Sequence, residues 1–337
     1  MCNIAAYVGE KAAAPILFEM IEKQEGFAGG YYTGIATIHN GRIYYEKLMG
    51  DSVRLKENTN ALNLPGNIGI IHSRSKSGGG DRWAHPFLGV REGKITEDYV
   101  ANGRAGSFSI GNEEYTCLIK ELIKDGFQFT SKTKSGDAVH MSDVMCQLIV
   151  RNISRGETPQ KAIETAFCTM PNEIVGLLLS LTEADKIFYG RINRPMMLSF
   201  ASHGAYLSTT AIVFPKDMGK VLTLPENSSG YVKKDSFYAS PFEKAPARVG
   251  EINNLMFEKA TKIIKSFLKE EGKTFTKIAK KILPLFENCD CGQNECLSYE
   301  VLRALYEKGE IEIIKNMVEG AAENIKAPQF IIILKEK

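Results

Sequence analysis

The chain of 337 residues opens with MCNIAAYVG (residues 1–9), the stretch that decides its fold. Residues 3–9 form a short apolar run, which predicts a buried strand. Cys2 directly follows the initiator methionine, and methionine aminopeptidases remove Met1 when the second residue is small. The mature chain would then carry a thiol and a free α-amine on the same residue.

Such a residue can act as nucleophile and base together. A thiol with a pKa of about 8.5 is mostly protonated at pH 7, whereas an α-amine with a pKa of roughly 7.7–8.0 can accept its proton, directly or through water. The alternative is a small residue that stands at position 2 by chance and merely packs. The dipeptide does not decide between these two interpretations, so the remaining chain has to supply the other parts of an acyl-transfer site.

Candidates for those parts lie in the first 150 residues. Arg74 ends a predicted strand and suits a planar carboxylate, and Asn102-Gly103 would offer an amide and a backbone N–H to an oxyanion. Asp143, at the start of a predicted helix, would suit an ammonium group. Each has a plainer interpretation: Arg74 as a solvated loop charge, Asn102-Gly103 as a turn, and Asp143 as a carboxylate favoured by the helix dipole.

The pattern of apolar residues predicts an α+β fold, because strand-like runs flank a middle block of helices. Asn40-Gly41 between two β-rich runs is a strong hairpin signal. The predicted helices and strands are helices over 15–26, 112–125, 142–153 and 159–170, and strands over 3–9, 31–38, 42–48, 69–72, 174–181, 186–192, 196–201, 205–208 and 211–214.

Taken together and in order, these pieces resemble the glutaminase domain of the class II glutamine amidotransferases. The similarity is greatest to the branch that includes glucosamine-fructose-6-phosphate aminotransferase, and it covers about residues 1–225. The segments that carry it are Met1-Cys2-Asn3-Ile4, Tyr32-Thr33-Gly34-Ile35-Ala36, Ile71-His72-Ser73-Arg74, Trp83-Ala84-His85-Pro86, Ala101-Asn102-Gly103 and Ser142-Asp143-Val144.

The resemblance implies a four-layer αββα N-terminal-nucleophile hydrolase fold and the hydrolysis of L-glutamine to glutamate and ammonia through a thioester. It makes Cys2 the nucleophile and base, and Asn102 with Gly103 the oxyanion hole. The remaining matched residues bind glutamine: Arg74 and Ser77 its carboxylate, and Asp143 its ammonium.

Four positions depart from the family pattern. Asn3 stands where the family has a glycine after the nucleophile, and Ser75 and Gly78 replace a tryptophan and a histidine of the substrate loop. Ala28 replaces an arginine. None of these changes removes a catalytic group, but together they indicate an altered loop around glutamine and a weak or differently regulated activity.

The chain divides, on its composition, into a glutaminase domain (1–235), a linker (236–249) and a helical C-terminal module (250–337). Fewer than about 100 residues remain after the linker, too few for the pair of isomerase units that accepts ammonia in the sugar aminotransferases. We therefore expect ammonia to pass to a separate acceptor protein. The module is predicted to hold helices over 252–272, 274–287, 298–308 and 310–323 and a strand over 329–335, in a winged-helix-like arrangement.

Three thiols of this module lie close together in sequence: Cys289, Cys291 and Cys296. They are a weak candidate for a zinc or iron–sulfur site, because a fourth ligand is not evident. A reduced or redox-sensitive loop is the alternative. The other cysteines beyond Cys2 are expected to be small buried hydrophobes.

Bulk composition excludes several other classes of protein. The net charge of +2 gives no field that favours nucleic acid, and no run reaches the roughly 18 apolar residues of a membrane span. The amino terminus lacks the features of a secretory signal, so a cytoplasmic protein is expected. No glycine-rich nucleotide motif is present, and no cofactor is predicted.

Three functions stay open on the sequence. The first is an active glutaminase, and the second is an amidase for another amide on the same fold. The third is a degenerate amidotransferase domain that serves as a binding or regulatory module. This hypothesis rests on the departures from the family pattern at Asn3, Ser75 and Gly78. The oligomeric state and the ammonia acceptor also stay open.

Overall fold

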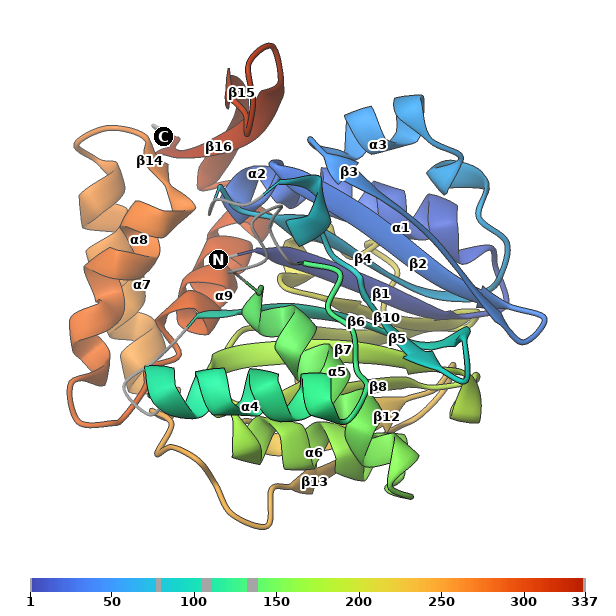
Figure 1. Ribbon diagram of the computed structural model, residues 1–337. Helices are drawn as coiled ribbons and strands as arrows, with labels where there is room; N and C mark the ends of the chain where they lie inside the picture. Colours follow the sequence, from blue (N-terminus) through green and yellow to red (C-terminus); the bar gives the residue numbers. More distant parts are fainter. Residues whose placement is uncertain (1, 77–79, 105–110, 132–138, 336–337) are drawn as a thin grey trace.

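A computed structural model describes residues 2–76, 80–104, 111–131 and 139–335. Two antiparallel sheets stack face to face, with helices on both outer faces, and a smaller C-terminal part lies beside one end of the stack (Figure 1). The α+β class and the four predicted layers are confirmed. Within the described residues no helix is both long enough and apolar enough to cross a lipid bilayer.

The first sheet has seven strands in the order β11-β9-β10-β1-β4-β2-β3. Its central strand β1 is the apolar run of the amino terminus, and every one of its residues is buried. The strands are β1 (Asn3–Gly9), β2 (Tyr32–His39), β3 (Arg42–Met49), β4 (Ile68–Arg74), β9 (Met197–Ala201), β10 (Gly204–Ser208) and β11 (Leu222–Thr223).

The second sheet has six strands in the order β13-β12-β8-β7-β6-β5. Between the two sheets lies an apolar layer to which β1, β6 and β7 contribute Ile4, Val100 and Val175. The strands are β5 (Phe87–Arg91), β6 (Lys94–Arg104), β7 (Glu173–Ser180), β8 (Ile187–Arg191), β12 (Ser228–Val232) and β13 (Phe237–Pro241).

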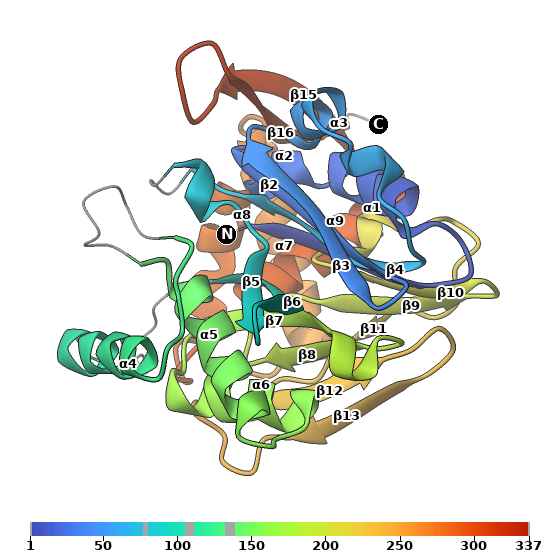
Figure 2. The same ribbon diagram turned by 45° about the vertical axis from the view of Figure 1, so that its right-hand side comes forward.

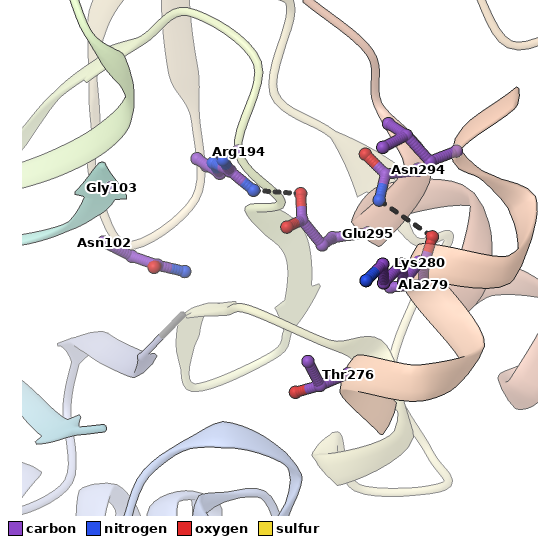
Figure 3. A pocket seen from close by; sticks show the side chains of 9 residues that line it. Asn102, Gly103, Arg194, Thr276, Ala279, Lys280, Asn294 and Glu295 are labelled. Atoms are coloured by element: carbon purple, nitrogen blue, oxygen red, sulfur yellow. Dashed lines mark hydrogen bonds and ion pairs between the residues drawn. The ribbon is translucent and has the colours of Figure 1, made fainter. Parts of the chain in front are cut away.

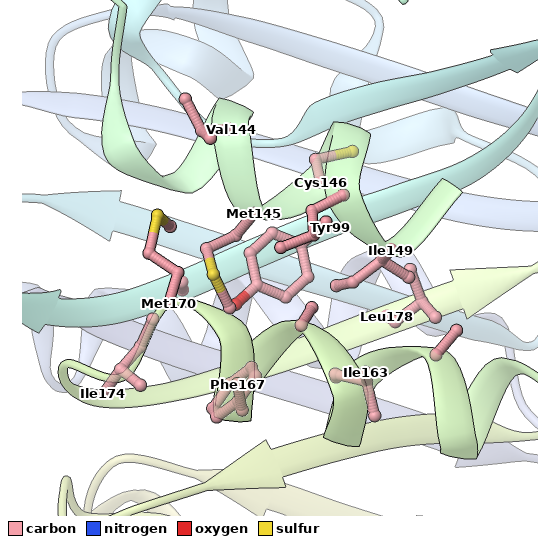
Figure 4. Packing of buried hydrophobic residues seen from close by; sticks show 14 of the residues in the cluster. Tyr99, Val144, Met145, Cys146, Ile149, Ile163, Phe167, Met170, Ile174 and Leu178 are labelled. Carbon is pink, nitrogen blue, oxygen red and sulfur yellow. The ribbon is translucent and has the colours of Figure 1, made fainter. Parts of the chain in front are cut away.

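Helices cover the outer face of each sheet (Figure 2). Helix α1 packs on β1 and β4, and α5 and α6 pack on the second sheet. Figure 4 shows side chains of α5 and α6 in one apolar cluster, among them Met145, Ile149, Ile163 and Phe167. The elements are α1 (Ala13–Glu22), α2 (Glu25–Ala28), α3 (Ser52–Asn58), η1 (Ala61–Asn63), η2 (Asp81–Trp83), α4 (Asn112–Lys124), α5 (Met141–Ser154), α6 (Pro159–Thr169), η3 (Leu181–Glu183) and η4 (Ala211–Val213).

Residues 250–335, which we call the C-terminal unit, share an apolar core that also includes Phe27 of α2. In chain order the unit is a helix, a short strand, two helices and a β-hairpin, and its three strands pair in the order β14-β16-β15. The elements are α7 (Asn254–Leu268), β14 (Lys273–Thr274), α8 (Phe275–Ile282), η5 (Leu283–Phe286), α9 (Asn294–Glu307), β15 (Ile311–Glu319) and β16 (Lys326–Leu334).

Three predictions about local structure are wrong. The helix expected over 310–323 is strand β15, because nine residues of it pair with β16. The strand expected over 211–214 is the 3-10 turn η4, which the Thr210 hydroxyl caps by accepting from the Ile212 N–H. The segment 236–249, expected to be a linker, contains β13, which pairs with β12 at the edge of the second sheet.

Glu25 is a fully buried carboxyl in α2 that ties this helix to α3 and β4. Its two oxygens accept from the Ser52 N–H at 3.0 Å and the Ser52 hydroxyl at 2.7 Å, and Ser73 donates to it at 3.3 Å. Burial raises the pKa of Glu25 to about 7, although the Ser52 hydroxyl opposes this shift.

The raised pKa of Glu25 makes a prediction about stability. The unfolded carboxyl has a pKa of about 4.3, so unfolding releases a proton between that pH and about 7. The free energy of unfolding therefore loses about 4 kcal/mol from this residue as pH rises through the window, and then no more. Between about pH 4 and pH 8, the free energy of unfolding of Glu25→Gln should rise by that amount relative to wild type, as measured by denaturant titrations. A pH-independent difference would contradict this, and Glu19→Gln, an exposed position of α1, is the control.

Candidate active site

Cys2 lies immediately before β1, at the end of the strand where the two sheets meet the C-terminal unit (Figure 1). Its backbone nitrogen donates to Asn102 Oδ1 at 2.9 Å, across 100 positions of sequence. Its Sγ lies 3.9 Å from the Ser75 hydroxyl. In a chain that has lost Met1, this nitrogen would be the α-amine, so Asn102 holds the group that would act as base.

Arg74 is the last residue of β4, the strand that pairs with β1 through Asn3 and Ser73. The side chain is 1% exposed, and its guanidinium carbon lies 4.6 Å from the centre of the Tyr32 ring. The same carbon lies 5.6 Å from the centre of the Trp83 ring. The cation is therefore held between two aromatic rings, next to the residue that contacts the Cys2 thiol.

Asn102 is fully buried on β6, and its two amide atoms have different surroundings. Oδ1 accepts from the Cys2 nitrogen, whereas Nδ2 is buried without a hydrogen-bond partner in the described part of the chain. An unpaired buried donor costs free energy unless a ligand satisfies it. The amide thus keeps one donor unpaired while its oxygen holds the Cys2 nitrogen. Gly103 follows it, and a Cβ there would lie 2.7 Å from the Glu173 carbonyl oxygen.

Asp143 is fully buried in the first turn of α5. One carboxylate oxygen accepts from the Ser131 N–H at 2.8 Å, and the other accepts from Gln147 Nε2 at 3.1 Å. Burial raises the pKa of Asp143, and the Ser131 N–H and the Gln147 amide oppose that shift. The carboxyl is thus held firmly, with its own helix and the preceding loop as partners.

A chain of contacts connects Asp143 with Arg74. Trp83 Nε1 donates to the Ser131 carbonyl oxygen at 2.5 Å, and the next contact along is the Ser131 N–H on Asp143. Trp83 also meets Arg74, as described above. The carboxylate and the guanidinium are thereby placed around one aromatic side chain, although they lie 69 positions apart in sequence.

Two buried histidines, His72 and His85, pack next to β6. The rings of His72 and His85 stack at 3.8 Å, and His72 Nε2 hydrogen-bonds the Ala101 carbonyl oxygen at 3.0 Å. Burial lowers the pKa of His72 to about 3 and that of His85 well below its usual value, so both rings are uncharged at neutral pH. The contact with Ala101 fixes β6 directly beside Asn102.

A cavity of about 360 Å³ opens beside Asn102 and Gly103. Its other walls come from Arg194, which follows β8, and from α8, η5 and α9 of the C-terminal unit. Figure 3 shows the Asn102 amide, the Thr276 hydroxyl and the Lys280 amino group facing the same open space. Arg74 and Asp143 are not among the residues that line it.

The structure brings Cys2, Arg74, Asn102 and Gly103 together, and the contacts of Trp83 connect Asp143 to them. Ser77 lies outside the described residues. The three thiols of the weak metal candidate do not converge: Cys289 donates to the Phe286 and Cys291 carbonyls, whereas Cys296 contacts Arg191. Among the described residues, no group of three or more His, Cys, Asp or Glu side chains could hold a metal ion.

The sequence pattern also misplaced two cysteines and missed Trp83. Cys117 and Cys168 are exposed, and only Cys146 of the three helix thiols is buried as expected. Trp83 is the single tryptophan of the chain, and it contacts Arg74 although the family's tryptophan position, next to the arginine, holds Ser75. Its rarity and its place in Trp-Ala-His-Pro were the available signals.

Known proteins resemble this chain over part of their length. No family model matches it. The glutamine–fructose-6-phosphate aminotransferase (isomerizing) of Bartonella henselae is 28% identical over 214 residues, which are 63% of this chain and 32% of that protein. The enzyme of the same name from Pyrococcus horikoshii is 26% identical over 259 residues, 76% of this chain and 40% of that one. The matches with this chain thus span only 32–40% of these relatives.

Among solved structures, glutamine phosphoribosylpyrophosphate amidotransferase from B. subtilis superposes with a TM-score of 0.63. The match covers 94% of this chain and 66% of that one, at 13% sequence identity. At so low an identity the superposition shows a shared fold and says nothing about activity.

Proposed function

Because the amino-terminal part of this chain is a class II glutamine amidotransferase domain, distantly homologous to the amino-terminal region of the fructose-6-phosphate aminotransferases, we propose that it hydrolyses L-glutamine to glutamate and ammonia. The observation that carries the proposal is the Asn102 side chain. It accepts from the Cys2 nitrogen with one atom and keeps a buried donor unpaired with the other.

In this mechanism the α-amine of mature Cys2 takes the thiol proton, and the thiolate attacks the side-chain amide carbon of glutamine. Asn102 Nδ2 and the Gly103 N–H donate to the oxyanion that forms. The intermediate collapses to a Cys2 thioester, and the proton held by the α-amine leaves with the nitrogen as ammonia. Water then attacks the thioester, glutamate departs, and the thiol is restored.

Two charges would hold the rest of the substrate. The Arg74 guanidinium offers a planar pair of donors to the α-carboxylate, and Tyr32 and Trp83 keep it in place. Asp143 accepts the α-ammonium, and Ser77 is assigned to the carboxylate by the resemblance alone. We further propose that the ammonia serves a separate acceptor protein, because the relatives that match this chain are named as aminotransferases, which transfer nitrogen to an acceptor.

The test is glutamate release from L-glutamine by protein whose amino terminus has been read by mass spectrometry. Processed protein should release glutamate, and a glutamine analogue with a diazoketone in place of the amide should alkylate Cys2 and stop it. Protein that retains Met1 should do neither, because its Cys2 has no free α-amine. If processed protein releases no glutamate with or without co-purifying proteins, the proposal fails.

Asp143→Asn should raise KM for glutamine by roughly 10- to 100-fold, because one charge-assisted hydrogen bond to the ammonium is lost. The kcat should change much less, since the ammonium is distant from the breaking bond. Steady-state kinetics with a thermal unfolding curve would measure this. Asp98, on β6, is another fully buried carboxyl. Asp98→Asn is therefore the matched control and should leave KM unchanged. An unchanged KM in Asp143→Asn would remove Asp143 from the proposed binding site.

A further inference from the structure

The C-terminal unit is attached on two sides of the proposed glutaminase site. On one side, Arg191 of β8 is fully buried, and its Nη2 bonds Gln293 Oε1 and approaches Cys296 Sγ at 3.3 Å. Arg194, 3% exposed, forms an ion pair with Glu295 of α9. These contacts fasten the amino-terminal end of α9 to the loop after β8.

On the other side, the hairpin strand β16 packs on α2. The rings of Phe330 and Phe27 meet edge to face at 5.0 Å. A Cβ on Gly26 would lie 2.3 Å from Phe330, and one on Gly30 would lie 2.6 Å from Pro328. The close fit needs glycine at both positions, so this interface is built into the sequence.

Between the two attachments, Tyr299 of α9 reaches the residue after the nucleophile. Its ring is fully buried, stacked on Phe275 at 3.9 Å and edge-on to Phe27 at 5.6 Å. Asn3 Nδ2 donates to the Tyr299 hydroxyl at 3.4 Å, across 296 positions of sequence. Asn3 is itself fully buried, and its side chain has no other hydrogen-bond partner in the described residues.

We infer that Tyr299 is a positioning residue of the glutaminase site, which holds Asn3 and thereby sets the place of the Cys2 thiol and nitrogen; this rests on the proposed function. Cys2 precedes the first paired residue of β1. Asn3 is therefore the residue next to the nucleophile that both the first sheet and the C-terminal unit hold. A displacement of about 1 Å at a reacting group can lower a rate by roughly 100-fold. The C-terminal unit, which also walls the cavity beside Asn102, is on this view a part of the active centre.

The inference accounts for Asn3, which stands where the resembling family has glycine. Glycine has no side chain that a tyrosine could hold. In this chain the amide and the hydroxyl form a matched pair contributed by two distant segments. Movement of α9, for example when a partner binds the unit, would therefore reach Cys2 through one contact.

The experiment is a double-mutant cycle of Tyr299→Phe and Asn3→Ala on the processed full chain. Two rates are measured: kcat for glutamine hydrolysis, and alkylation of Cys2 by iodoacetamide across pH, followed on the amino-terminal peptide by mass spectrometry. Tyr299→Phe keeps the ring stack and removes only the hydroxyl. We expect each single variant to lower kcat about three- to tenfold with KM unchanged, and to shift the pH profile of alkylation. The double variant should be no worse than the worse single one.

Tyr306→Phe, an exposed tyrosine of the same helix, is the control and should match wild type. The inference is overturned if Tyr299→Phe behaves like this control in both assays, or if the two substitutions act additively. If wild type does not hydrolyse glutamine but Tyr299→Phe still changes Cys2 alkylation, the proposed function fails and the positioning role stands. If processed wild type is not alkylated at Cys2 at all, both fail.

Discussion

Replacing Cys2 with alanine is expected to lower kcat/KM for glutamine hydrolysis by roughly 10⁴- to 10⁶-fold, the range seen when an enzyme loses its nucleophile. Alanine leaves the α-amine and the hydrogen bond from the Cys2 nitrogen to Asn102 in place. The loss would therefore be chemical, without a change in how the amino terminus is held. Glutamate release and the midpoint of thermal unfolding, measured on the same protein, check both statements.

The matched control is Cys117→Ala, which removes an exposed thiol of α4 and should leave the rate unchanged. Alanine at position 2 also permits removal of Met1, so both proteins should begin at residue 2. A Cys2→Ala protein that keeps more than about a tenth of the wild-type rate would show that another group performs the attack.

Asn102→Ala should lower kcat by roughly 10²- to 10³-fold, with a smaller change in KM. The Nδ2 donor would act only when charge develops on the substrate oxygen, and loss of one such donor has an effect of this size. The variant also removes the acceptor of the Cys2 nitrogen. Asn102→Asp separates the two roles, because it keeps an acceptor but has no donor, and we expect it to be as slow as the alanine variant.

A second buried amide serves as the control for Asn102. Asn152 of α5 is 5% exposed, and its side-chain amide donates to the carbonyl oxygen of Ala162 in α6. Asn152→Ala should lower stability by about 1 kcal/mol and leave kcat unchanged. If Asn102→Ala keeps kcat within threefold of wild type, the oxyanion is stabilised elsewhere and the proposed mechanism is wrong at this step.

Local signals in the sequence predicted much of the fold. The buried strand at residues 3–9 is β1, and Asn40-Gly41 forms the hairpin between β2 and β3, with φ values of 48° and 70°. Such left-handed values suit these two residue types, which is why the pair is informative by itself. Thr158-Pro159 begins α6, where the Thr158 hydroxyl accepts from the Lys161 N–H.

Predictions were wrong where a distant partner decides the structure. Residues 311–319 have apolar side chains that fit a helical pattern as well as an alternating one, and only pairing with β16 makes them a strand. The expected linker hides β13 for the same reason: its five residues are extended because β12 lies beside them. Strand structure depends on a neighbour that composition does not reveal.

In the candidate site, too, local motifs predict some residues, and distant contacts decide others. The sequence predicts Cys2, Arg74, Asn102 and Asp143 as site residues, because their motifs and the order of those motifs resemble a known family. Their chemical roles stay predictions until the variants are measured. Trp83 lies in one of the matched segments, but the motif does not reveal its contact with Arg74, and Tyr299 belongs to no motif.

The buried strand over residues 3–9, the hairpin, the α+β class and the place of the thiol beside that strand follow from residues close together in the chain, whereas the central position of β1 follows from its pairing with β4 and β10. The surroundings of that thiol depend on contacts between distant segments. Asn102 lies 100 positions from Cys2, and Tyr299, which contacts Asn3, lies 296 positions from Asn3. The physical reason is that hydrogen bonds and ring contacts act over a few ångströms in space. Which side chains come within that range is settled by how sheets, helices and the C-terminal unit pack together.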